Sequence, residues 1–171
     1  MNVCKAVFIL RNEIQIPLVV IGGGGKYKQQ VKDFVKQNNL EKKIIFLSEQ
    51  PTARDSNRFQ NAEDFPAIYQ SAIAMIYPSL FEGFGIPILE SLWSRLPVIT
   101  SAISSLPEVG GEAAYYVDPQ RAEEIAEGMR KICGDEAMAN DLKDRGLHQA
   151  QKFTAELCTG RVMNVYKGLM P

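Results

Sequence analysis

Short, uninterrupted apolar runs are the feature that most limits what this chain can fold into. Five of them, without alternating polar positions, occupy residues 18–21, 44–47, 72–77, 97–100 and 114–117. A strand that is apolar on both faces must be buried on both faces, as in a parallel sheet between two layers of helices. The pattern therefore predicts an α/β domain with three layers and a parallel sheet.

Segments with helical spacing separate these runs. We expect helices at residues 3–11, 26–38, 65–70, 87–93, 120–133, 136–152 and 154–169. Right-handed crossovers place the carboxyl ends of parallel strands on one edge of the sheet, where open α/β sheets bind ligands. The loops 22–25, 48–63 and 79–85 fall on that edge. Because a helix precedes the first visible strand, we also expect that a strand in front of it is absent.

Size and composition exclude several classes of protein. The 171 residues fit one domain, residues 1–171, and the net charge of −1 gives no reason to expect a nucleic-acid partner. No apolar run reaches the ~20 residues that span a bilayer. The three cysteines, Cys4, Cys133 and Cys158, are odd in number and far apart. That spacing favours a reducing, cytoplasmic location over disulfides or a zinc site.

A run of four glycines, residues 22–25, lies between a predicted strand and a predicted helix. Glycine lets backbone approach a ligand, and a helix N-terminus offers unpaired N–H groups, so the run is consistent with a phosphate site. It is equally consistent with a tight turn that only permits packing. The dinucleotide-binding fingerprint fits poorly because Tyr27 stands at its third glycine, and no Walker loop follows.

The loop after the third apolar run holds two carboxylates eight positions apart, Glu82 and Glu90. Gly83 and Gly85 free the backbone to turn, and Pro87 suits a first helical turn. Both carboxylates could accept hydrogen bonds from the hydroxyls of a ligand at the helix start. Taken singly, Glu90 could instead complement the helix dipole and Glu82 could be a solvated loop residue. The flanking residues Phe81 and Phe84 could be core anchors.

The stretch from Glu82 to Glu90 resembles the Glu-x7-Glu signature of retaining glycosyltransferases of family 4 (group 1), which have the two-domain GT-B fold. The segments 19–24, 45–48, 68–72, 96–100 and 106–110 resemble its neighbouring strands and loops, so the resemblance covers roughly residues 17–166. It implies the Rossmann-like C-terminal half of a GT-B fold, which binds the nucleotide-sugar donor. The N-terminal acceptor domain would be absent, and the helix at 154–169 would cross back toward it.

The resemblance also implies a role for each matching residue. Glu82 would be catalytic, contacting hydroxyls of the transferred sugar, and Glu90 would hold the ribose. The segment from Phe46 to Ser48 would lie near the base. Two groups would lie near the diphosphate: Gly22, Gly23 and Gly24, and the amides of Gly83, Phe84, Gly85 and Ile86. No cofactor or tightly bound metal is implied. The partners would be a nucleotide sugar and the absent domain, through which any peripheral membrane contact would come.

Two departures from the family pattern are visible. The Arg and Lys that usually precede the first helix of this domain are missing, with Lys26 at best a partial substitute. The stretch 50–62 is longer than usual, and it could reshape base selection or be disordered. We therefore expect a glycosyltransferase of the hexosyltransferase type whose isolated chain is inactive. A non-catalytic nucleotide-sugar-binding module and a GT-B epimerase are the alternatives. Trp93 and Tyr69 are expected in the core, and His148 on the surface.

Overall fold

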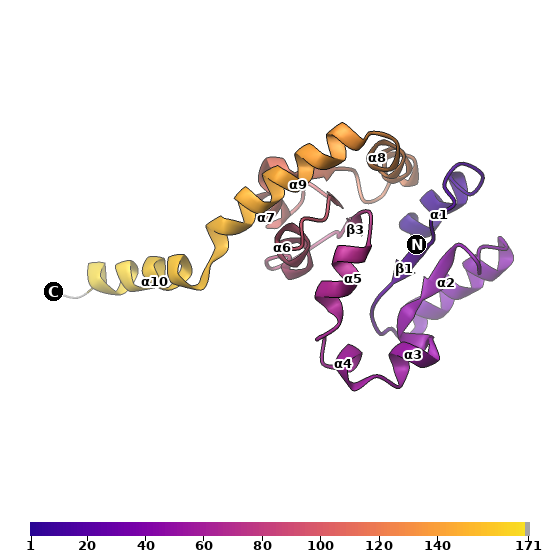
Figure 1. The fold of residues 1–171 in the computed structure, drawn as a ribbon, viewed down its shortest axis with the longest axis horizontal. Coiled ribbons are helices and arrows are strands. Elements are labelled where there is room, and N and C mark those ends of the chain that lie inside the picture. The colour runs from indigo at the N-terminus through magenta and orange to yellow at the C-terminus, as the bar shows by residue number, and fades with distance from the viewer. Residues whose placement is uncertain (170–171) are drawn as a thin grey trace.

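The computed structural model describes residues 1–169 and contains five parallel strands in two sheets (Figure 1). Strand β1 (Leu18–Val20) pairs with β2 (Ile44–Phe46). In the second sheet, β4 (Val98–Thr100) lies between β3 (Met75–Tyr77) and β5 (Ala114–Tyr116). All pairs are parallel, as the solid apolar runs predict. Among the described residues, however, no strand pairing joins the two sheets.

Helices connect the strands at nearly all the expected places. Their bounds are α1 (Asn2–Ile9), α2 (Lys26–Gln37), α5 (Phe65–Ser71), α6 (Ile86–Trp93), α8 (Ala122–Gly134), α9 (Glu136–Ala150) and α10 (Ala155–Leu169). The polar stretch after β2 is not an irregular excursion, because it contains a 3-10 turn (Leu47–Glu49) and two one-turn helices, α3 (Pro51–Arg54) and α4 (Asn57–Gln60). The short helix α7 (Leu106–Gly110) was not predicted.

The larger sheet is covered on both faces, as a three-layer domain requires. Val98 and Ile99 are adjacent on β4 and point to opposite faces, yet both are fully buried. Ile99 belongs to a cluster with α1, α8 and α9, including Leu10, Ile125 and Leu142. Val98 belongs to a second cluster with α6 and α7, including Ile88, Leu92, Leu106 and Val109. Helices therefore bury both faces of β4.

Helix α1 contacts both halves of the molecule. Its residue Ala6 and the C-cap residue Leu10 pack in the cluster beside β4 and α8. Its residues Cys4 and Val7 pack in a third cluster with α2 and β2, together with Val31, Val35, Leu40 and Ile44. The apolar side chains of α1 therefore link the two sheets by packing, because no strand pairing links them within residues 1–169.

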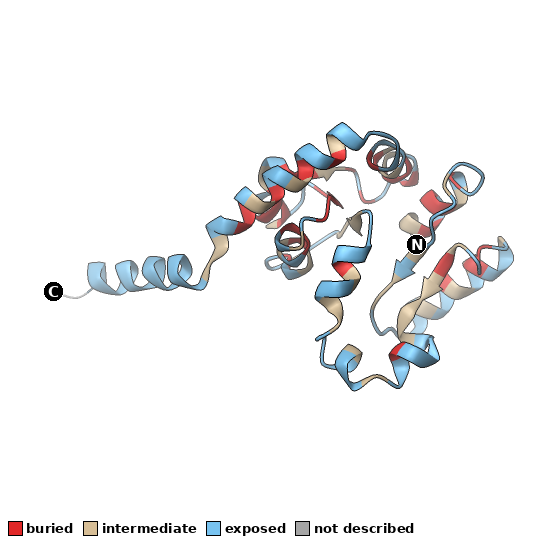
Figure 2. Cartoon of the chain, viewed as in Figure 1, coloured by how far each residue is buried: buried red, intermediate tan, exposed pale blue. Residues whose placement is uncertain are grey.

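Helix α10 extends away from the rest of the molecule, and every described residue in it is exposed (Figure 2). Its apolar side chains Leu157, Val162, Met163 and Val165 are 45–63% exposed. His148 is exposed on α9, as predicted. The prediction for Trp93 was wrong, because this side chain ends α6 with 45% of its surface exposed.

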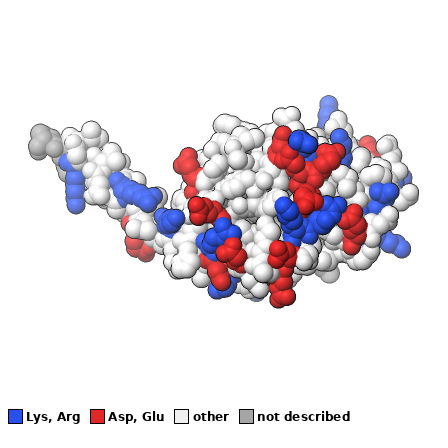
Figure 3. All heavy atoms as spheres, turned by 90° about the horizontal axis from the view of Figure 1, so that it is seen from above, with Lys and Arg blue, Asp and Glu red and all other residues white. Residues whose placement is uncertain are grey.

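Acidic and basic side chains are intermixed on the face drawn in Figure 3, without a large patch of one sign. The structure therefore agrees with the near-neutral composition in offering no electrostatic platform on that face. No helix within residues 1–169 combines the length and the apolarity needed to cross a bilayer.

Candidate functional site

Glu82 follows β3 in a loop that four hydroxyl groups hold in place. Its carboxylate accepts a 2.6 Å hydrogen bond from the hydroxyl of Tyr77, the last residue of β3. Its main-chain oxygen accepts hydrogen bonds from Ser104 Oγ (2.6 Å) and Ser105 Oγ (3.0 Å). Ser79 Oγ donates to the oxygen of Phe81 at 3.2 Å. Both the backbone and the carboxylate of Glu82 are thus fixed in direction.

Glu90 lies exposed on α6, on the turn that follows Pro87. Its carboxylate accepts a 2.9 Å hydrogen bond from the hydroxyl of Tyr69 on α5. Tyr69 is buried, as predicted for a core residue, but its hydroxyl reaches out of the core to this carboxylate. The two acidic residues of the motif therefore have the same arrangement, in which a tyrosine of a neighbouring element holds one carboxylate oxygen.

Both tyrosines remain protonated at neutral pH. Burial, together with the smaller effect of the hydrogen bond to the Glu82 carboxylate, raises the pKa of Tyr77 to about 12. Burial also raises the pKa of Tyr69, with a second contribution from the Glu90 carboxylate beside it. Each phenol is therefore a permanent donor, and each carboxylate keeps its other oxygen for a hydroxyl of a ligand.

Gly85 makes the turn that starts α6. Its φ of +99° lies in the left-handed region, where residues with a side chain are strained. A Cβ atom here would lie 2.9 Å from Leu106 Cδ2, so the backbone packs directly against α7. Within the described chain, the N–H groups of residues 83–86 donate to no backbone carbonyl. These amides are free to bind an anion at the positive end of the helix dipole.

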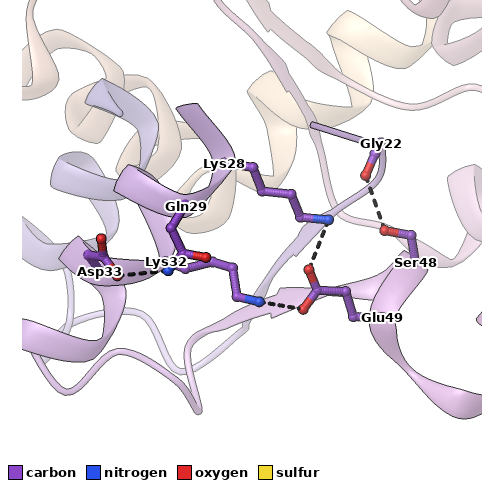
Figure 4. A network of polar contacts seen from close by, with 7 residues as sticks. All are labelled: Gly22, Lys28, Gln29, Lys32, Asp33, Ser48 and Glu49. Atoms are coloured by element: carbon purple, nitrogen blue, oxygen red, sulfur yellow. Dashed lines mark hydrogen bonds and ion pairs between the residues drawn. The ribbon is translucent and has the colours of Figure 1, made fainter. Parts of the chain in front are cut away.

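The glycine run follows β1 and leads into α2 (Figure 4). Gly22 has a φ of +138°, and its carbonyl accepts a 3.1 Å hydrogen bond from Ser48 Oγ, just beyond β2. A Cβ atom on Gly24 would lie 2.7 Å from Lys28 Cβ, so the loop folds closely over the first turn of α2. The structure therefore brings together two predicted donor-binding segments, the glycine run and Ser48.

Two lysines of α2, Lys28 and Lys32, form ion pairs with Glu49 (Figure 4). Lys28 Nζ lies 2.9 Å and Lys32 Nζ 3.0 Å from its two carboxylate oxygens, and these contacts lower the pKa of Glu49. Both ammonium groups also lie over the ring of Phe46, at 5.5 and 6.0 Å from its centroid. The Phe46 side chain thus packs against α2. Lys26 is exposed to solvent.

Comparison with known proteins shows the family of this chain. The profile of the family described as "Glycosyl transferases group 1" matches residues 2–149. The chain belongs to this family. It is 32% identical over 158 residues to the O-antigen chain mannosyltransferase B of Escherichia coli, which covers 92% of this chain. The match covers 39% of that relative, so the chain spans about two fifths of its length.

Solved structures of glycosyltransferases share the fold. The C-terminal domain of the group 1 family protein LpcC from Francisella tularensis matches with a TM-score of 0.72 at 26% identity, over 88% of this chain and 76% of that one. Anabaena HepE, solved in complex with UDP-glucose, matches with a TM-score of 0.81 at 16% identity, over 98% of this chain and 44% of that one. The predicted Rossmann-like half of a GT-B fold is therefore confirmed.

The sequence analysis singled out Glu82, Glu90 and the glycines of the two loops but missed the groups that hold them. Tyr77, Ser104 and Ser105 were not singled out, and Tyr69 was assigned to packing alone. No local pattern identifies them, because their partners are brought near only by the fold. Phe81 is 79% exposed and is not a core anchor, whereas Phe84 packs edge-on against Phe153 with ring centroids 5.6 Å apart.

Proposed function

We propose that this chain is the donor-binding domain of a retaining glycosyltransferase of the hexosyltransferase type. The observation that carries the proposal is the pair of tyrosine-held carboxylates, Glu82 and Glu90, at the start of α6. Each has an oxygen available for a hydroxyl donor, and unpaired amides lie in the loop between them. A nucleoside-diphosphate sugar offers hydroxyl groups at both ends of a diphosphate, which suits this order of groups.

Each segment then has a role in transfer. Glu82 is the catalytic carboxylate and accepts hydrogen bonds from hydroxyls of the sugar that is transferred, while Glu90 accepts them from the ribose. The amides of residues 83–86 stabilise the negative charge that develops on the departing diphosphate. The glycines 22–24 approach the same diphosphate from β1, and the segment from Phe46 to Ser48 lies beside the base.

The acceptor and the rest of the enzyme lie outside this chain in our proposal. A second, N-terminal domain supplies the acceptor site and closes over the donor, so the chain alone has little or no transfer activity. The exposed apolar side of α10 faces that domain. We further propose that transfer needs no cofactor and no tightly bound metal, and that the enzyme is cytoplasmic, which the widely spaced cysteines support. The mannosyltransferase relative makes a mannose donor the first to test.

Ligand-observed NMR with UDP-, GDP- and ADP-mannose tests the proposal, with the corresponding glucose donors as a second set. We expect saturable binding of one nucleotide class. Glu90→Gln should weaken that binding about 10- to 100-fold, because a hydrogen bond to a charged group contributes about 1.5–3 kcal/mol. Glu82→Gln should weaken binding of the nucleotide sugar but not of the free nucleotide.

Glu123→Gln is the matched control, because Glu123 is an exposed helical glutamate on α8. It should bind like the wild type. Equal affinities for Glu90→Gln and Glu123→Gln would refute the role of Glu90. Binding by none of the donors would refute the donor-binding function for this chain.

A further inference from the structure

The polar stretch between β2 and α5 begins and ends at the candidate site. It leaves β2 through the 3-10 turn Leu47–Glu49, which contains Ser48 of the segment proposed for the base. It returns through α4 into α5, whose residue Tyr69 donates to Glu90, the carboxylate proposed for the ribose. Figure 1 shows α3, α4 and α5 following one another along one side of the molecule. The stretch therefore leads from the base end of the proposed site to its ribose end.

A column of three aromatic rings connects this stretch to Glu90. Phe59 of α4 packs against Phe65, with ring centroids 5.6 Å apart and an angle of 55° between the rings. Phe65 packs against Tyr69 at 6.3 Å and 59°. These two residues are four positions apart on α5, so they lie on one face of that helix. The Tyr69 hydroxyl ends the aromatic column with its 2.9 Å hydrogen bond to Glu90 Oε2.

The turn between α4 and α5 holds the far end of the aromatic column. Ser56 Oγ caps α4 by accepting a 3.2 Å hydrogen bond from Phe59 N. Glu63 N donates to Arg58 O at 2.8 Å, and Arg58 Nε lies 2.9 Å from Asp64 Oδ1. These contacts fix α4 relative to the start of α5, and they keep the first two rings of the column together.

The aromatic column lies apart from the hydrophobic core. Phe59 and Phe65 are half-buried, and within residues 1–169 neither belongs to one of the three buried clusters. Their rings pack against each other and against Tyr69 instead. Glu90 is exposed, and an exposed glutamate side chain ordinarily moves among several rotamers. The column therefore orders a carboxylate that solvent alone would leave free to rotate.

We propose that the aromatic column positions Glu90 to accept the hydroxyls of a ribose, so that the polar stretch before α5 contributes to the preference for ribonucleotides over their deoxy forms. Tyr69 is a positioning residue in this scheme, because it holds one carboxylate oxygen and leaves the other for the ligand. Since the carboxylate is ordered before the ligand arrives, binding costs less side-chain entropy. The proposal rests on the proposed function, which takes Glu90 as the group that binds the ribose.

The ratio of affinities for ribonucleotides and 2′,3′-dideoxyribonucleotides tests the proposal. Ligand-observed NMR gives the Kd of UDP, GDP and ADP and of their dideoxy forms. The wild type should prefer the ribonucleotide of the class that it binds by about 10- to 100-fold, as expected for hydrogen bonds to a charged group. Tyr69→Phe keeps the ring and should lower this ratio about 2- to 10-fold, because the released Glu90 carboxylate must be ordered on binding. Phe65→Leu breaks the column and should lower the ratio at least about twofold.

Tyr116→Phe is the matched control. The Tyr116 hydroxyl is also half-buried and donates a 2.7 Å hydrogen bond, in this case to Gly111 O. Tyr116 lies on β5, which β4 separates from β3. Its variant should keep the wild-type ratio, because a general loss of stability weakens the binding of both nucleotide forms equally. The ratio therefore distinguishes positioning of Glu90 from a purely structural role of Tyr69.

The possible outcomes separate this proposal from the proposed function. A wild-type ratio in Tyr69→Phe or in Phe65→Leu overturns the positioning role and leaves the ribose role of Glu90 intact. A wild type that binds both nucleotide forms equally, or neither, refutes the ribose role of Glu90 and the positioning role with it. Circular dichroism checks that each variant is folded, and Phe59→Leu takes the place of Phe65→Leu if that variant is not.

Discussion

The turn at Gly85 offers a sharp test of how the motif loop is built. Gly85→Ala places a Cβ atom on a residue with φ +99°, which costs about 1–2 kcal/mol in the left-handed region. The same atom lies 2.9 Å from Leu106 Cδ2 and 3.5 Å from Ile88 Cδ1. Both neighbours are fully buried, so relief of that overlap costs about 1–3 kcal/mol. We expect a loss of roughly 2–5 kcal/mol in the free energy of unfolding.

Urea unfolding followed by circular dichroism measures this loss, and a thermal scan should show a midpoint lower by roughly 4–20 °C. Gly83→Ala is the matched control. Gly83 lies two positions earlier in the same loop, its φ is outside the left-handed region, and its Cβ would meet nothing within 4 Å. That variant should be neutral or up to about 1 kcal/mol more stable. A difference between the two variants below about 1 kcal/mol would refute the assignment of strain to Gly85.

Two further predictions concern tyrosine ionisation and the last helix. The pKa of Tyr77 is raised from 10.0 to about 12 in the folded chain, so this phenol ionises at a lower pH in the unfolded chain. The free energy of unfolding should therefore fall as the pH rises from 10 to 12. Tyr77→Phe should flatten that part of the stability profile, and an unchanged slope would contradict the assignment. Deletion of residues 155–171 should leave the thermal midpoint within about 2 °C, because no described residue of α10 is buried; a larger drop would show that α10 docks on the domain.

The sequence predicted the elements well because their causes are local. Solid apolar runs produced strands, and apolar spacing of three and four produced the helices that cover them. Helix α7 was missed because five residues, one of them Pro107, do not show a helical period. The separation of the two sheets was not predictable from any run, because it depends on which strand edges meet. The helix that precedes β1 was the one local sign that the two sheets are separate.

Apolar residue type was a weaker guide to burial than to secondary structure. Trp93 and Phe81 are exposed, although Trp93 directly follows the buried Leu92. Trp93 ends α6 on the side away from the cluster that buries Ile88 and Leu92. Tyr69 in the candidate site was correctly expected to be buried. The hydrogen bond that its hydroxyl group donates to Glu90 was not expected. A tyrosine can satisfy packing and hold a carboxylate at once.

The position of one half of the candidate site relative to the other depends on α1. The glycine run follows β1 and the Glu82 loop follows β3, and these strands belong to different sheets. Backbone pairing fixes each loop within its own sheet, whereas α1 links the two sheets through side-chain packing. Ala6 and the C-cap residue Leu10 pack toward β4, and Cys4 and Val7 pack toward β2. Side-chain packing tolerates small shifts that a hydrogen-bonded ladder does not. The spacing between the glycine run and the Glu82 loop therefore depends on how tightly α1 packs against both sheets.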